Sequence, residues 1–256
     1  MAKKEKKNKK ASFFKERADE LRHIKESLES QFMMPEADYS PLSIAAKELD
    51  RIANSPATPL TWGYNIQNLI LPVGSIRNIE PQGIVLKVCI DCEIEADIEK
   101  WDNKKGEDPF SNYSFHLSVF GEQNAIKYSR GFHIDRDAVE GSEECHPLYH
   151  MHFYDGVYDN GQSLKDVEKH RGSVSIRTPR FSHYPLDIVL GVGFYLLNYH
   201  GSDTFMNFYN NNEWFSRSYY ASQKRILEPY YLAVSGHLES KHVNWKDNNL
   251  LCPQIV

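Results

Sequence analysis

The feature that most constrains the fold is a change of hydrophobic periodicity partway along the chain. Up to about residue 56 apolar residues recur at helical spacing, whereas the later segment "GIVLKVCIDCEIEA" alternates between apolar and polar residues. A period of two places the apolar side chains on one face of a β-strand and the polar ones on the other. The sequence therefore predicts a helical beginning followed by a sheet with one buried face.

Three further segments repeat this alternation, namely "SFHLSVF", "IKYSRGFHI" and "LYHMHFY". With "SIRNIE" before them and "SVSIRT" after them, they predict a meander of antiparallel strands. The apolar members should form the buried face of this sheet, and they are Leu86, Val88, Ile90, Cys92, Ile94, Phe115, Leu117, Val119, Ile126, Tyr128, Phe132, Ile134, Tyr149, Met151 and Phe153.

Two helices are expected before the sheet. The first begins at Ser12, a suitable N-cap, and runs up to Pro35, while the second begins at Ser40 and Pro41 and ends before "NSPATP". Each carries an apolar stripe, made by Phe14, Ala18, Leu21, Leu28 and Phe32 in the first and by Leu42, Ala45, Leu49 and Ile52 in the second. Such stripes pack within the same chain or, if the first helix does not fold back, bind a partner protein.

The basic opening "MAKKEKKNKK" has too little apolar surface to pack, so residues 1–11 are expected to be a disordered tail. The helical pair then occupies 12–56, and residues 57–256 are expected to form a single α+β domain.

Two helical regions are expected after the strands. "HYPLDIVLGVGFYLLNYHG" is apolar all round and predicts a central helix buried against the sheet, starting near Pro185. A long region from about Glu213 to His237 predicts a C-terminal helix that Pro229 kinks or breaks. The expected fold class is α+β, with an antiparallel sheet covered on one face by these helices and preceded by the N-terminal pair.

Composition narrows the class of protein. With 41% hydrophobic and 25% charged residues the chain reads as a soluble globular protein, and its net charge of −5 argues against a strongly electrostatic DNA-binding protein. Apolar runs stay below the roughly 18 residues that a membrane span needs, so a cytoplasmic protein is expected. Phosphate-loop, dinucleotide-binding, serine-hydrolase and zinc-protease motifs are absent from the sequence.

Alternation also gathers polar residues on the opposite face of the predicted sheet. It assigns to this face one set of imidazoles, carboxylates, cations and hydroxyls, namely Asp91, Glu93, Glu95, His116, Ser118, Lys127, Ser129, His133, Asp135, His150, His152 and Arg177. His150 and His152 are two apart on one strand, so both project to the same side.

A metal site is one interpretation of this face. His150 and His152 would provide two ligands and His133, Asp135 or His116 a third, which suits Zn²⁺, Mn²⁺ or Fe²⁺. A second interpretation is acid/base catalysis without metal, in which His133, His150 and His152 transfer protons and Arg177 or Lys127 holds an anion such as phosphate. The third is a solvated or partner-covered sheet face, with His146 in a turn before Pro147.

Two other motifs admit a functional and a structural interpretation. "CIDC" resembles a redox or zinc pair, but Cys89 and Cys92 lie an odd number of residues apart and should point to opposite faces of a strand. "RTPRFSHYPLD" places Arg177, Arg180 and His183 before the start of the central helix, where an anion could bind unless Asp187 satisfies the helix N-terminus itself.

The segment "HPLYHMHF", followed by "SIRTPRFSHYPLDIVLGVGFYLLNY", resembles a pattern of uncharacterised bacterial proteins. In these a His-Pro-x-x-His-x-His-aromatic strand precedes an Arg-x-Pro element and an apolar helix that starts at a proline. The resemblance covers about residues 145–199 and implies an accessory component of a mobile or phage-defence gene cluster. It assigns no catalytic residue.

Two functions are therefore expected from the sequence. The first is a non-catalytic subunit of a bacterial multi-protein system that binds a protein, a second copy of itself or nucleic acid, through the polar sheet face or the N-terminal helix. The second is a histidine-dependent hydrolase acting on phosphodiesters, with or without a divalent metal such as Zn²⁺ or Mn²⁺.

Overall fold

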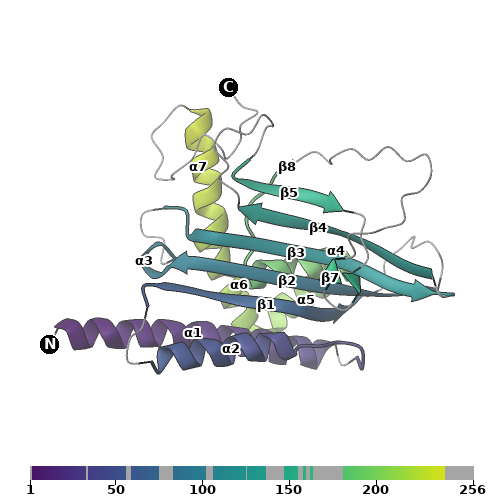
Figure 1. Ribbon diagram of the computed structural model, residues 1–256, viewed down its shortest axis with the longest axis horizontal. Helices are drawn as coiled ribbons and strands as arrows, with labels where there is room; N and C mark the ends of the chain where they lie inside the picture. Colours follow the sequence, from purple (N-terminus) through teal and green to yellow (C-terminus); the bar gives the residue numbers. More distant parts are fainter. Residues whose placement is uncertain are drawn as a thin grey trace.

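Six strands pair in the order β1-β2-β3-β4-β5-β8 to form one antiparallel sheet in the computed structural model (Figure 1). They are β1 (Thr61–Pro72), β2 (Val85–Asp97), β3 (Phe110–Gln123), β4 (Ile126–Arg136), β5 (Tyr149–Tyr154) and β8 (Phe181–Ser182), and a separate pair is made by β6 (Tyr158–Asp159) and β7 (Gln162–Ser163). The structure describes residues 2–32, 34–55, 59–74, 83–101, 106–124, 126–136, 147–154, 158–159, 162–163 and 181–239.

The predicted meander is confirmed, because each strand from β1 to β5 pairs with the next one in the chain. The first strand, β1, was not expected from the sequence. Its alternation is broken by a bulge between Ile66 and Leu69, where Asn68 takes a positive φ of 59°. The expected strands "SIRNIE" and "SVSIRT" lie outside the described residues.

One face of the sheet is covered by the C-terminal helices, which lie behind it in Figure 1. These helices are α4 (Ile188–Tyr199), α5 (Ser202–Asn211), α6 (Glu213–Ser222) and α7 (Glu228–Leu238), and a π-helical turn, η1 (Gln223–Leu227), joins the last two. Gly191 brings α4 close to the sheet, since a Cβ there would lie 2.5 Å from the Phe115 ring. The α+β fold with a covered face is thus confirmed, although α5 had not been expected.

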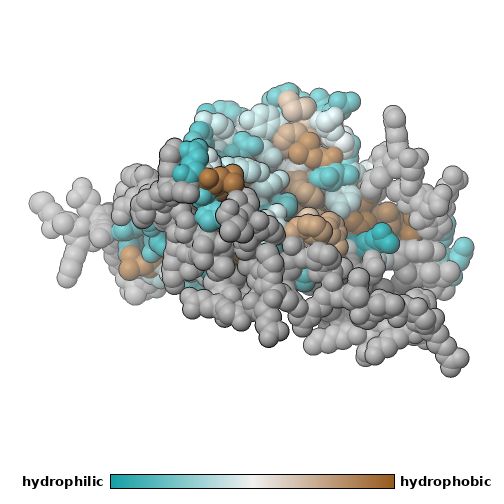
Figure 2. All heavy atoms as spheres, turned by 90° about the horizontal axis from the view of Figure 1, so that it is seen from above, coloured by the Kyte–Doolittle hydropathy of each residue, from teal (hydrophilic) through white to brown (hydrophobic). Residues whose placement is uncertain are grey.

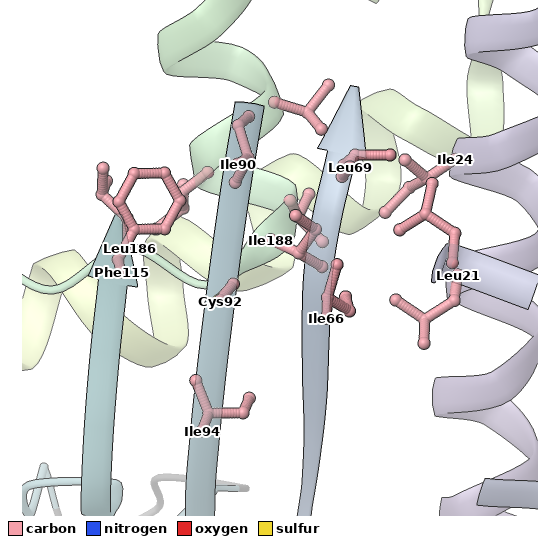
Figure 3. Packing of buried hydrophobic residues seen from close by; sticks show 14 of the residues in the cluster. Leu21, Ile24, Ile66, Leu69, Ile90, Cys92, Ile94, Phe115, Leu186 and Ile188 are labelled. Atoms are coloured by element: carbon pink, nitrogen blue, oxygen red, sulfur yellow. The ribbon is translucent and has the colours of Figure 1, made fainter. Parts of the chain in front are cut away.

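The N-terminal pair packs on the same core. Helix α1 (Ala2–Gln31) directs Leu21 and Ile24 toward Ile66 and Leu69 of β1 (Figure 3), and α2 (Ser40–Ala53) buries its predicted stripe beside it. The apolar stripe of the first helix is therefore used inside the chain and offers no partner-binding surface. Between the two helices, Asp38 exchanges backbone hydrogen bonds of 2.9 and 3.2 Å with Ile70 on the outer edge of β1.

The first helix begins at Ala2 and not at Ser12, so the described residues 2–11 are helical where a disordered tail was expected. Alanine, lysine and glutamate dominate this segment and are strong helix formers. Their helix propensity outweighs the lack of apolar residues on which the sequence-based expectation relied.

The prediction that Phe153 belongs to the core is wrong, because this residue is 51% exposed. It projects on the helix side of the sheet, but β8 pairs only with His150 and Met151, so the end of β5 extends beyond this neighbour. Its ring instead contacts Phe132 and Phe181 at centroid distances of 6.2 and 6.5 Å. Val119 and Met151 are half-buried, while the side chains of Ile126 and Tyr128 lie outside the described residues.

Pro229 lies at the start of α7, directly after the π-helical turn η1. The backbone stays helical from α6 through η1 into α7, so the interruption expected at Pro229 takes the form of a wider turn in the hydrogen bonding and not of a break. Within the described residues, no helix combines the length and the hydrophobicity that crossing a bilayer requires.

The start of α4 is anchored by buried polar groups. Asp187 is its N-cap and accepts hydrogen bonds from the Leu190 N–H at 2.9 Å and from the Ser222 hydroxyl at 2.7 Å. Tyr64 of β1 and Tyr113 of β3 accept from the N–H groups of Ile188 and Leu186 at 3.0 and 2.8 Å. Asp187 thus satisfies the helix N-terminus itself, which was the structural alternative to an anion site.

Replacing Asp187 with alanine is expected to lower the free energy of unfolding by about 2–4 kcal/mol, because two buried donors lose their acceptor. Asp203→Ala, at an exposed position in the first turn of α5, is the matched control and should change it by less than about 0.5 kcal/mol. Urea denaturation measures the free energy of unfolding of both variants. Equal decreases in the two would contradict a special role for the N-cap Asp187.

His200 ties the end of α4 to the end of β1. Its Nε2 atom lies 3.0 Å from the Pro72 carbonyl oxygen and 2.7 Å from the Tyr195 hydroxyl, which itself donates to Pro72 at 2.6 Å. Burial lowers the pKa of His200, and the hydrogen bond to Pro72 offsets only part of this effect. The folded protein therefore holds His200 neutral more strongly than the unfolded chain does.

The free energy of unfolding is consequently expected to fall as the pH is lowered. The unfolded chain binds a proton at His200 near the ordinary pKa of about 6.5, while the folded protein resists it, so the contribution is complete above that pH and is lost as the pH drops below it. His200→Gln keeps a donor for Pro72 but does not titrate. The variant should show a shallower fall in the free energy of unfolding between pH 7.5 and 5.5 than the wild type, and an identical slope would exclude this role.

Candidate metal centre on the polar face of the sheet

The strand register aligns the polar residues of β3, β4 and β5 in two adjacent rows. In the first, His116 lies opposite His133, and His133 lies opposite His152. In the second, Asp135 lies between Ser114 and His150. Four histidines and one aspartate that are spread over 37 positions of the sequence therefore meet on one sheet face.

His133, Asp135 and His150 form the tightest group. Each offers one ligand atom, and the three atoms all lie within 4.8 Å of one another. The Asp135 carboxylate faces two imidazoles, with Oδ2 3.2 Å from Nε2 of His133 and Oδ1 3.8 Å from Nε2 of His116. His133 and Asp135 are about one quarter to one third exposed, so the group is reachable from solvent.

His150 is oriented by the chain just before its own strand. It is buried, and its Nδ1 atom lies 3.2 Å from the carbonyl oxygen of Pro147. A carbonyl oxygen only accepts hydrogen bonds, so Nδ1 is the donor in this contact and Nε2 is the candidate ligand atom. A backbone carbonyl that fixes the tautomer in this way is a common support of metal-binding histidines.

Asp135 is held in the charged form. Burial by itself would raise its pKa, but hydrogen bonds from His116 and Ser114 and the charges of His133 and His116 outweigh burial and lower the pKa. An ionised carboxylate at this position is the form that a metal ion needs as a ligand.

Two imidazoles and one carboxylate suit a divalent first-row metal ion such as Zn²⁺, Mn²⁺ or Fe²⁺. Three protein ligands leave coordination positions for water or substrate, which is the arrangement of catalytic and not of structural sites. A bound ion of this kind supplies an acidified water molecule and a Lewis acid.

The other expected site residues flank this group or lie outside the described residues. His116 faces the second oxygen of Asp135, and its ring centroid is 5.2 Å from that of His133. His152 is half-buried, with ring centroids 5.2 and 5.7 Å from those of His133 and His150. Arg177, Arg180 and His146 lie outside the described residues, and so does the side chain of Lys127.

Carboxylates dominate the neighbouring part of the face. Asp91 lies opposite His116, and its Oδ1 atom accepts a 2.6 Å hydrogen bond from the backbone N–H of Asn68 in the β1 bulge. Glu93 and Glu95 follow on the same strand and are exposed. Neither Asn68 nor Pro147 was expected to support the site, because both act through backbone atoms that leave no trace in the side-chain pattern.

Cys89 and Cys92 lie on opposite faces of β2, as the spacing predicted. Cys92 is part of the core, whereas Cys89 lies on the polar face with its Sγ atom 3.9 Å from an Asp91 oxygen. Burial and the charge of Asp91 raise the pKa of Cys89 to about 12. Cys145 and His146, which could complete a zinc site together with two thiols, lie outside the described residues.

Both thiols should resist thiol–disulfide exchange in the folded protein, because the thiolate is the reactive species. In a Cys145→Ser/Cys252→Ser variant, an aromatic disulfide reagent at pH 7.5 is expected to label Cys89 and Cys92 at least about 100-fold more slowly than in the denatured chain. Rapid labelling of one thiol under native conditions would contradict the buried, protonated state.

Comparison with known proteins adds nothing to this geometry: no protein-family model, no curated protein and no solved structure matches the chain.

Proposed function

We propose that this protein is a metal-dependent hydrolase that acts on phosphodiesters. The observation that carries the proposal is the convergence of His133, Asp135 and His150 within 4.8 Å on the polar sheet face. These three residues would hold a divalent ion, and a water molecule on that ion would be the nucleophile. His116 and His152 flank the ligands and are the candidates for proton transfer.

The charges around the site favour the metal-dependent form of the hypothesis over the metal-free one. Among the described residues of this face, Asp91, Glu93 and Glu95 repel a phosphodiester, and Lys87 on β2 is the cationic side chain that could attract one. A divalent ion would therefore be needed to hold an anionic substrate. Arg177, expected to act as an anion clamp, stays a prediction.

Metal binding and hydrolysis test the proposal together. After dialysis against a chelator, the protein should bind one Zn²⁺ or Mn²⁺ per chain in a calorimetric titration. His133→Ala/His150→Ala should lower this affinity by at least about 100-fold, the upper end of what loss of an outer-shell partner costs. Cleavage of bis(4-nitrophenyl) phosphate should require the ion and should fall to background in the variant.

His237→Ala, on the partly exposed surface of α7, is the matched control and should keep both properties. Undiminished metal binding by the double variant would reject the site. Metal binding without cleavage of phosphodiesters by the wild type would reject the hydrolase while leaving the metal centre in place.

A non-catalytic binding subunit is the second candidate, and exposed apolar side chains on the C-terminal helices favour it. Trp214 and Tyr220 of α6 and Tyr231, Leu232 and Leu238 of α7 are each more than half exposed. In the view of Figure 2, hydrophobic patches stand between hydrophilic ones on the coloured part of the surface. A binding subunit would keep its function in the His133→Ala/His150→Ala variant, so the same variant separates the candidates. The bacterial defence context stays a prediction.

A further inference from the structure

The two carboxylate oxygens of Asp135 face different imidazoles. Oδ2 lies 3.2 Å from Nε2 of His133, inside the group that would hold the ion, whereas Oδ1 lies 3.8 Å from Nε2 of His116 on the neighbouring strand β3. A carboxylate oxygen only accepts hydrogen bonds, so Nε2 of His116 is the donor toward Oδ1. One oxygen of Asp135 is thus directed into the metal-binding group and the other toward a residue beside it.

His116 is held in place from both neighbouring strands. On β4 it lies opposite His133, and the two rings stack with their centroids 5.2 Å apart and their planes inclined by 29°. On β2 it lies opposite Asp91, whose carboxylate accepts a 2.6 Å hydrogen bond from the backbone N–H of Asn68. Side chains directly opposite each other in a sheet lie within contact range and limit each other's movement. The His116 ring is therefore kept directed at Asp135.

Asp135 receives a second support from the same strand. Ser114 lies directly opposite Asp135, and its side chain donates a hydrogen bond to the carboxylate. Strand β3 thus holds Asp135 with two residues, while the group of His133, Asp135 and His150 comes from β4 and β5. Residues that support ligand carboxylates in this way typically change metal affinity by roughly 10–100-fold when they are removed.

The contact with His116 decides how many oxygen atoms Asp135 can offer. A carboxylate can bind a metal ion through one oxygen or through both. While His116 holds Oδ1, Oδ2 is the oxygen that remains for the ion, so Asp135 contributes one ligand atom. A second oxygen on the ion would compete for the coordination position that the water nucleophile needs.

We propose that His116 is a positioning residue of the metal centre, which holds Oδ1 of Asp135 so that this carboxylate coordinates the ion through Oδ2 alone. The inference rests on the metal centre of the proposed function. It also separates the two histidines that flank the ligands, because His116 acts through Asp135 and His152 remains the candidate for proton transfer.

Calorimetric titration with Zn²⁺ and the visible spectrum of bound Co²⁺ test this role. His116→Ala should lower the affinity for Zn²⁺ by about 10–100-fold. The same variant should alter the Co²⁺ spectrum, because Oδ1 of Asp135 is released and enters the coordination sphere. His116→Gln, whose side-chain amide can donate to Oδ1, should restore the affinity to within about threefold of the wild type and return the wild-type spectrum.

Asn112→Ala is the matched control. Asn112 lies on the same face of β3 and donates at 3.1 Å to Glu93, a carboxylate outside the metal-binding group. Its loss should leave the affinity and the spectrum unchanged.

The outcomes separate this role from the metal centre itself. A wild-type protein that binds neither ion would reject both. Wild-type binding with an unchanged affinity and spectrum in His116→Ala would overturn the positioning role and leave the metal centre in place. If His116→Gln loses as much affinity as His116→Ala, His116 is a ligand, and the positioning role is overturned as well.

Nitrogen-15 NMR of the wild-type imidazoles decides without a substitution. When Zn²⁺ is added, one ring nitrogen of His133 and one of His150 should shift to the metal-bound range, while Nε2 of His116 should stay protonated. A metal-bound Nε2 of His116 would overturn the proposal.

Discussion

The hydrogen-bonded register of β3, β4 and β5 is the constraint on which both the core and the candidate metal centre depend. Phe115 lies opposite Ile134, and Ile134 lies opposite Met151, so these apolar residues share the face of the sheet that the C-terminal helices cover. The same register places His116, His133 and His152 in one row. A slip of one residue in β4 would expose Ile134 and drive His133 into the core. Burial of the hydrophobic face therefore also fixes the geometry of the polar face.

Helix α4 reinforces that register. Glycine at position 191 allows the helix to touch Phe115. The Tyr64 hydroxyl accepts from the N–H of Ile188, the first residue of the helix, and the Tyr113 hydroxyl accepts from the N–H of Leu186 just before it. The polar network of Asp187 and Ser222 then links α4 to α6. Polar groups that are fully satisfied in this way specify one arrangement of helices on the sheet, where apolar packing alone would allow sliding.

The strands β2 to β5 and the helices α2 and α4 could be predicted because period and capping are local properties of the sequence. Ser40 and Pro41 start α2 where expected, and Cys89 and Cys92 diverge as their spacing requires. The alternation also assigned His116, His133, Asp135, His150 and His152 to one face. It could not choose the group His133, Asp135 and His150, because that choice depends on cross-strand register and on the Pro147 carbonyl. Strand β1 was not predicted, because the bulge at Asn68 shifts the alternation of apolar and polar residues along the strand.

The bulge in β1 and the Asp38 bridge have a consequence for assembly. An exposed, regular edge strand invites a second chain to add its own strand. In β1 the outward N–H and carbonyl of Ile70 are already paired with Asp38, and the bulge at Asn68 interrupts the row of groups beside them. The edge of β1 is therefore occupied at Ile70, and a strand added there would have to displace Asp38.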